Sequence, residues 1–164
     1  MSKTALNMAV LTVSDTRTLE TDTSGSTLAE RIRQDGHHLV DRKLVKDDLF
    51  HIRAIIADWI FQPGIQVVLI TGGTGFSGRD VTPDAIAPLL VDVIPGFGEL
   101  FRQLSFQEVG TSTIQSRAVA GLANRTMVVA LPGSTGACRT AWDRILKEQL
   151  DSTHKPCNFV AEIS

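Results

Sequence analysis

Polar loops follow four apolar segments of the sequence, at the points where strands are predicted to end. They are Ser14-Asp15, Asp47-Asp48, Thr71-Gly72-Gly73-Thr74-Gly75 continuing to Asp80, and Pro132-Gly133-Ser134. Glycines let backbone N–H groups approach an anion closely, and the N-terminus of a following helix adds partial positive charge. These loops therefore predict a phosphate-binding site.

Two of the loop carboxylates, Asp47 and Asp80, are candidate ligands for a divalent cation. Mg²⁺ prefers one or two carboxylates together with phosphate oxygens, and it would neutralise phosphates where no P-loop lysine is present. Phosphoryl-type transfer depends on positioning and charge stabilisation more than on covalent help from the protein. We therefore predict that Asp47 and Asp80 are the catalytic and metal-binding residues of such a reaction.

The glycine-rich segment also matches parts of two better-known motifs. Gly73 to Gly78 has the pattern G-x-G-x-x-G, but it follows the third predicted strand, and the helix-start signal Thr82-Pro83 comes several residues later. The segment continues as Arg79-Asp80, where a P-loop requires Lys followed by Ser or Thr. We exclude a P-loop and keep a nucleotide-dependent oxidoreductase as a remote alternative.

Several candidate residues also have a simpler structural interpretation. Asp47 or Asp48 is expected to cap the following helix, and Asp80 could close a local turn. Asp84 is an acid in the first turn of a helix, where it interacts with the helix dipole, so it is a secondary candidate. For Arg117, a solvent-exposed charge and a planar phosphate-binding fork are equal alternatives.

Apolar runs and helical periodicity alternate along the chain, which predicts the elements that carry these loops. The alternation implies an α/β fold of three layers, with a mostly parallel sheet between two layers of helices and ligands at the carboxyl ends of the strands. His37 and His38 face opposite sides of a strand and are expected at the surface. The predicted strands are 7–13, 38–45, 65–71 and 126–131, with an edge strand at 158–163. The predicted helices are 28–34, 49–60, 82–90, 97–106, 114–122 and 137–150.

Length and composition place the chain among ordinary globular proteins. Its 164 residues, 43% hydrophobic and 21% charged, suffice for one domain, predicted over 1–164, without disulfide or metal staples. A net charge of −2 leaves no basic surface for nucleic acid. The longest uncharged stretch, 61–78, contains Pro63 and repeated glycine, which argues against a membrane span. With two cysteines, Cys138 and Cys157, and no N-terminal signal pattern, we expect a cytoplasmic protein.

Several segments together resemble the MoaB/MogA family of molybdenum cofactor biosynthesis proteins, over nearly the full length of the chain. The segments that resemble the family as a whole are VVLITGGTG (67–75), RDVTPDA (79–85), PGFGE (95–99), Ser116-Arg117 and LPGS (131–134). Those that resemble MoaB in particular are DTSG (22–25), GHHLV (36–40), LSFQEVGTSTIQSRAVAG (104–121) and GSTGACRTAW (133–142).

The resemblance implies three layers around a mainly parallel sheet, assembly into trimers or hexamers, and adenylation of molybdopterin by Mg-ATP with release of pyrophosphate. Asp47 and Asp80 match the family's essential acids, and Ser14, Ser116, the TGGTG glycines and the 132–134 loop match its ligand contacts. Together with neighbouring positions, the predicted substrate-binding residues are Ser14, Asp15, Thr71, Gly72, Gly73, Thr74, Gly75, Asp84, Ser116, Arg117, Pro132, Gly133 and Ser134.

Two functions are consistent with this resemblance. The leading hypothesis is a homo-oligomeric molybdopterin adenylyltransferase that uses ATP and Mg²⁺, and the intact acidic segment 80–84 favours a working enzyme. The alternative is a non-catalytic carrier or assembly factor that binds molybdopterin and delivers it to other proteins of the same pathway. Neither hypothesis involves nucleic acid or a membrane.

Overall fold

The computed structural model describes residues 2–164 and contains a six-stranded sheet with the strand order β2-β1-β3-β6-β5-β4. The strands are β1 (Asn7–Val13), β2 (His38–Val45), β3 (Val67–Thr71), β4 (Asp92–Val93), β5 (Val119–Ala123) and β6 (Thr126–Leu131). The pairs β1–β2, β1–β3 and β3–β6 are parallel, whereas the pairs β5–β6 and β4–β5 are antiparallel. The predicted α/β fold with a mostly parallel sheet is confirmed.

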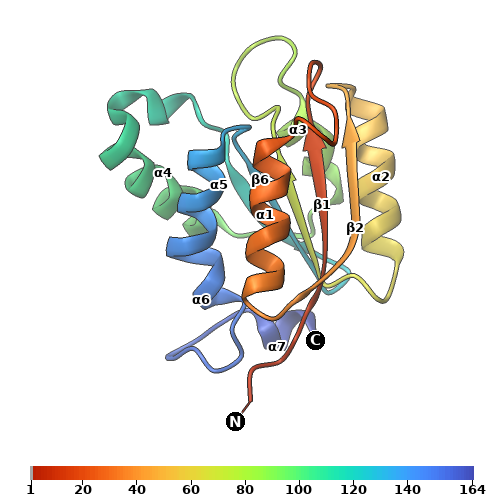
Figure 1. Cartoon of the computed structure of the whole chain (residues 1–164), viewed down its shortest axis with the longest axis vertical. Helices are drawn as coiled ribbons and strands as arrows, with labels where there is room; N and C mark the ends of the chain where they lie inside the picture. Colours follow the sequence, from red (N-terminus) through yellow and green to blue (C-terminus); the bar gives the residue numbers. More distant parts are fainter. Residues whose placement is uncertain (1) are drawn as a thin grey trace.

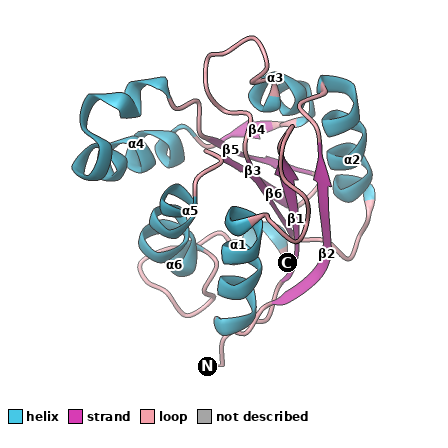
Figure 2. Cartoon of the chain, turned by 45° about the horizontal axis from the view of Figure 1, so that its top comes forward, coloured by secondary structure: helices cyan, strands magenta, loops and turns pink. Residues whose placement is uncertain are grey.

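Helices cover both faces of this sheet and form the outer two layers (Figures 1 and 2). The helices are α1 (Thr23–Gln34), α2 (Leu49–Phe61), α3 (Thr82–Ile86), α4 (Pro95–Val109), α5 (Thr135–Ala141), α6 (Lys147–Gln149) and α7 (Val160–Ile163). The helices α1, α4 and α5 pack on one face, and α2 and α3 pack on the other. None of the helices within residues 2–164 is both long enough and apolar enough to span a membrane.

The central strands are apolar because both of their faces are covered. Met8 and Val10 of β1 pack beneath α1 and α5, whereas Ala9 and Leu11 pack beneath α2. Every residue of β3 is buried. Burying an aliphatic side chain of this size contributes about 1.5–3 kcal/mol, so the central strands hold the sheet edge firmly in place.

The strand order places a topological switch point between β1 and β3. The chain runs from β1 to β2 on one side, and then crosses to β3 on the other side of β1. In open α/β sheets, ligands bind outside the carboxyl ends of the strands at such a point. The loop after β3, yellow-green at the top of Figure 1, lies at this edge of the sheet.

The helix predicted over 114–122 is wrong. The chain forms a 3-10 turn over Gly110–Gln115 and then strand β5, which pairs antiparallel with β6. Asn124 and Arg125 connect the two strands with φ angles of 48° and 63°, as a tight hairpin turn requires. Pairing with β6 therefore overrides the helical spacing of this segment.

The sequence predictions also differ from the structure in an element type, in a helix start and in a missed strand. The predicted edge strand at 158–163 is the short helix α7, which buries Val160 and Ile163. The first helix begins at Thr23 rather than at residue 28, because the Asp22 side chain caps it by accepting from the Gly25 N–H. Strand β4 lies at the sheet edge in a segment for which no strand was predicted.

The helix-start signal at Thr82-Pro83 is confirmed, since Thr82 is the first helical residue of α3. The capping position is Val81, which makes no side-chain capping bond. The Thr82 hydroxyl instead donates to the Gly72 carbonyl oxygen at 2.8 Å, and the Thr82 N–H donates to the Gly73 carbonyl oxygen at 3.0 Å. Thr82 therefore ties the start of α3 to the glycine segment after β3.

His37 is buried, contrary to the prediction that it lies at the surface, and is 4% exposed. Its Nδ1 accepts from the Leu6 N–H at 3.1 Å, and its ring lies edge-on to Trp142. Burial and, to a smaller extent, the positive charge of Lys3 together lower the pKa of His37 to about 4. The imidazole is therefore neutral in the folded protein at neutral pH.

This burial predicts a loss of stability in mild acid. Because His37 takes up a proton near pH 6.5 only when the chain is unfolded, its contribution is complete above pH 6.5 and is lost as the pH falls toward 4. The loss should approach about 1.4 kcal/mol per pH unit within that window. Urea unfolding of His37→Asn should show a weaker pH dependence than the wild type between pH 7 and 5. The exposed-site control His38→Asn should keep the wild-type dependence, and equal slopes for all three proteins would contradict the assignment.

Candidate active site

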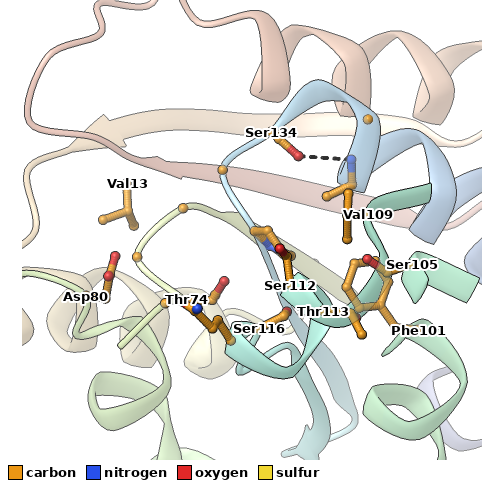
Figure 3. Close-up of a pocket in the computed structure, with 18 of the residues that line it drawn as sticks. Val13, Thr74, Asp80, Phe101, Ser105, Val109, Ser112, Thr113, Ser116 and Ser134 are labelled. Atoms are coloured by element: carbon orange, nitrogen blue, oxygen red, sulfur yellow. Dashed lines mark hydrogen bonds between the residues drawn. The ribbon is translucent and has the colours of Figure 1, made fainter. Parts of the chain in front are cut away.

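A cavity of about 610 Å³ lies over the carboxyl ends of the parallel strands. The loops after β1, β2, β3 and β6 form one side of it, and α4, the 3-10 turn after α4 and α5 form the other. Figure 3 shows Asp80 toward one end, and Phe101 and Ser105 toward the opposite end. All four loops singled out in the sequence therefore meet at one cavity.

Most of the predicted site residues line this cavity, and three do not. Those that line it are Ser14, Asp15, Asp47, Gly72, Gly73, Thr74, Gly75, Asp80, Ser116, Pro132, Gly133 and Ser134. Thr71 lies beneath the cavity, where its hydroxyl donates to the Pro132 carbonyl oxygen. Asp84 and Arg117 are outside the lining and bind each other at 3.1 Å.

Gly72 and Gly73 have positive φ angles of 106° and 69°, which favour glycine. A Cβ on Gly72 would overlap the carbonyl oxygen of Val13, and one on Gly73 would lie 2.6 Å from Asp47 Oδ1. Only glycine allows the chain after β3 to pass this close to the ends of β1 and β2. The close approach leaves the Asp47 carboxylate directly beside the glycine segment.

Asp47 presents a buried carboxylate oxygen that has no hydrogen-bond partner within residues 2–164. The neighbouring Asp48 caps α2 instead, since its side chain accepts from the His51 N–H at 2.7 Å. Burial raises the pKa of Asp47, and the negative charges of Asp15 and Asp80 raise it further. A buried acceptor without a partner is energetically unfavourable, so this oxygen is suited to a cation or a proton.

Asp80 lies beside Asp47 in the same cavity, at the end of the loop after β3. One of its oxygens accepts from the Ser77 N–H at 3.0 Å, and a Cβ on Gly75 would lie 2.8 Å from that oxygen. Asp80 thus closes a local turn, and its carboxylate also faces the cavity.

The carboxylates of Asp47 and Asp80 have the chemistry to hold a magnesium ion whose other ligands would come from a substrate and water. Residues 2–164 contain no group of three or more His, Cys, Asp or Glu side chains that could hold a metal ion alone. Mg²⁺ commonly binds through one or two carboxylates, with phosphate and water oxygens completing its octahedron. The unpartnered oxygen of Asp47 and the carboxylate of Asp80 suit that arrangement.

Arg117 fixes the position of the loop that carries Asp80. Its guanidinium donates to the carbonyl oxygens of Gly75 and Asp80, at 2.9 and 2.6 Å, and to the carboxylate of Asp84. It also lies over the ring of Phe76, 5.3 Å from the ring centroid. These contacts give Arg117 a role that was not among the two predicted alternatives, which is to hold the loop after β3.

Three serines of the cavity share one hydrogen-bonding pattern. The hydroxyl oxygen of Ser14 accepts from the N–H groups of Thr16 and Arg17, that of Ser116 from Ala118, and that of Ser134 from Ala137 (Figure 3). A hydroxyl has one donor and two acceptor positions. Each serine can therefore offer its proton to an acceptor on a ligand.

Sequence reasoning missed the side of the cavity formed by α4 and α5. The missed residues of that side are Phe101, Ser105, Glu108, Val109, Ser112, Thr113, Gln115, Gly136, Ala137 and Thr140, and Val13 and Thr16 were missed on the other side. Phe101, Ser105 and Glu108 recur at helical spacing on α4, which is the signal that could have identified this face. The Thr140 hydroxyl of α5 donates to Glu108 at 2.7 Å and links the two helices. One end of the cavity thus carries carboxylates and glycines, and the other end carries hydroxyl groups and an aromatic ring.

Comparisons with known proteins agree with the resemblance found in the sequence. Residues 9–152 match the family described as a probable molybdopterin binding domain. The chain is 54% identical over 152 residues to molybdenum cofactor biosynthesis protein B of Escherichia coli K12, which covers 93% of this chain and 89% of that protein.

Solved structures give the same result. A crystal structure of molybdenum cofactor biosynthesis protein B superposes with a TM-score of 0.88 at 40% identity, covering 92% of this chain and 94% of that one. The tungsten cofactor synthesizing protein MoaB of Pyrococcus furiosus gives a TM-score of 0.79 at 34% identity, covering 88% and 92%. The fold, the matched segments and these similarities together show that the chain belongs to the MoaB/MogA family of molybdenum cofactor biosynthesis proteins.

Proposed function

We propose that this protein adenylates molybdopterin with Mg-ATP. Membership of the family supports a role in molybdenum cofactor biosynthesis. The observation that carries the more specific proposal is the buried, unpartnered oxygen of Asp47, which lies beside Asp80 and a glycine segment in one cavity. Carboxylates placed beside backbone suited to phosphate are what a metal-dependent nucleotidyl transfer requires.

In this reaction, a phosphate oxygen of molybdopterin attacks the α-phosphorus of ATP. A new P–O bond forms, the bond between the α-phosphorus and the α,β-bridging oxygen breaks, and pyrophosphate leaves. Asp47 and Asp80 would hold Mg²⁺, which when bound neutralises phosphate charge and polarises the P–O bonds. Ser14 and Ser134 would donate hydrogen bonds to phosphate oxygens from the loops after β1 and β6.

The protein contributes positioning and fixed charge rather than a covalent intermediate. The glycine segment is held from beneath by the Gly72 N–H, which donates to the Leu131 carbonyl oxygen at 2.9 Å, and by Thr82. Arg117 holds the same segment from its outer side. Groups held in this way need little reorganisation when negative charge develops on the reacting phosphates.

The proposal predicts pyrophosphate release that requires both substrates. Purified protein incubated with molybdopterin, Mg²⁺ and ATP should form pyrophosphate and adenylated pterin in equal amounts. Omitting the pterin, or removing the metal with EDTA, should abolish both products. Binding of molybdopterin without pyrophosphate formation would contradict adenylation and would favour the carrier hypothesis.

Asp80→Asn should lower the turnover number by roughly 10²-fold or more, because it removes a preorganised charge from the reaction site. The fold should persist, since the Asn side-chain oxygen can still accept from the Ser77 N–H. The matched control is Asp58→Asn on the exposed surface of α2, which should leave turnover unchanged. Full activity of Asp80→Asn, measured by pyrophosphate release, would exclude Asp80 from the reaction.

Arg117→Met should lower turnover about tenfold with little change in the KM for ATP, because Arg117 contacts the loop rather than the cavity. If Arg117 acts through Asp80, the Asp80→Asn/Arg117→Met double variant should be scarcely slower than Asp80→Asn alone. Arg125→Met, in the exposed hairpin turn, serves as the control. Multiplicative losses in the double variant would show that Arg117 does not act through Asp80.

A further inference from the structure

Asp15, which lines the cavity, forms an ion pair with Arg79, and neither side chain has a role in the reaction described above. The guanidinium Nε donates to Asp15 Oδ2 at 3.0 Å, and Nη2 donates to Oδ1 and Oδ2 at 2.9 and 2.8 Å. Asp15 belongs to the loop after β1, and Arg79 belongs to the loop after β3. The pair therefore joins the two loops on either side of the switch point.

The ion pair is open to solvent, and part of the guanidinium remains available. The side chains of Arg79 and Asp15 are 66% and 35% exposed. Ion pairs this exposed contribute little to stability, because water screens them. The contacts to Asp15 use Nε and Nη2 only, so Nη1 can reach another acceptor.

The cavity needs a cation that its own lining does not supply. It is lined by Asp15, Asp47 and Asp80, whereas no lysine or arginine within residues 2–164 lines it. Arg117 is already engaged by two carbonyl oxygens and by Asp84. A polyphosphate would bring further negative charge into a cavity that already holds three carboxylates. A nearby cation with free N–H donors would therefore favour its binding.

Arg79 is close enough to act on the cavity. It binds Asp15, which lines the cavity. It also immediately precedes Asp80, and the Asp15 carboxylate that it binds accepts from the Asp47 N–H at 3.2 Å. Arg79 thus lies next to both proposed metal ligands.

We propose that Arg79 binds the polyphosphate of the nucleotide, and that Asp15 holds the guanidinium in place until the nucleotide enters. The planar fork that pairs with a carboxylate also matches two oxygens of a phosphate, which carries more negative charge. On binding, the guanidinium leaves Asp15 for the ligand. This inference rests on the proposed function, because it assumes that a nucleotide occupies the cavity.

The test measures equilibrium binding of the Mg²⁺ complex of a non-hydrolysable ATP analogue, α,β-methylene-ATP, by titration calorimetry. Arg79→Gln should weaken binding about tenfold, and Arg79→Lys should give an intermediate loss, since it keeps the charge but not the fork. Molybdopterin binding, followed by fluorescence, should change less than twofold. Arg125→Gln is the matched control and should bind the analogue as the wild type does.

Asp15→Asn separates a transferable ion pair from a merely structural one. The Asn side-chain oxygen can still accept from the Asp47 N–H, while the competing charge is lost. Asp15→Asn should therefore tighten analogue binding about threefold, and this gain should shrink in the Arg79→Gln background. If Asp15→Asn weakens binding as much as Arg79→Gln does, the pair only braces the loops and the proposal is wrong.

The outcomes also separate this inference from the adenylation proposal. If the wild type binds the analogue but never releases pyrophosphate from ATP with molybdopterin, adenylation fails and the role of Arg79 stands. If the wild type releases pyrophosphate and Arg79→Gln binds the analogue equally well, only the role of Arg79 fails. A wild type that binds no nucleotide overturns both.

Discussion

The close approach of the backbone at Gly72 and Gly73 to the ends of β1 and β2 is the constraint on which the rest of the site depends. At these positions a side chain would collide with the Val13 carbonyl oxygen or with the Asp47 carboxylate. Gly72 approaches the backbone of Val13 at the end of β1, and Gly73 approaches the Asp47 side chain in the loop after β2, so the contact ties together the loops that follow three neighbouring parallel strands. The buried oxygen of Asp47, the position of Asp80 and the path of the loop between them all follow from that contact.

The sheet and its polar edge could be predicted from the sequence because the relevant signals are local. Strands β1, β3 and β6 are apolar along their length, and each ends abruptly in serine, glycine or proline. In a parallel sheet, such endings must lie on one edge. Asp47 and Asp80 could be placed together on this reasoning, without any knowledge of the distances between them.

The predictions that were wrong concern segments whose structure depends on distant partners. Residues 119–123 combine small and aliphatic side chains in a spacing that suits either a helix or a strand, and only pairing with β6 decides between them. His37 is buried because β2 begins beneath Trp142 of a remote helical segment. The hydroxyl-rich side of the cavity was missed for the same reason, since α4 and α5 reach the site only through tertiary packing.

The two arginines near Asp80 show how one residue type serves two purposes. Arg117 donates to two backbone carbonyl oxygens and lies over an aromatic ring, so its charge is used to shape the loop. Arg79 binds only a solvent-exposed carboxylate through its side chain. The hydroxyl of Ser14 is restricted in another way, because backbone N–H groups occupy both of its acceptor positions. The Ser14 hydroxyl therefore has only its proton left to offer, so it can donate to an oxygen of a ligand but has no position at which to accept from a ligand N–H or O–H group.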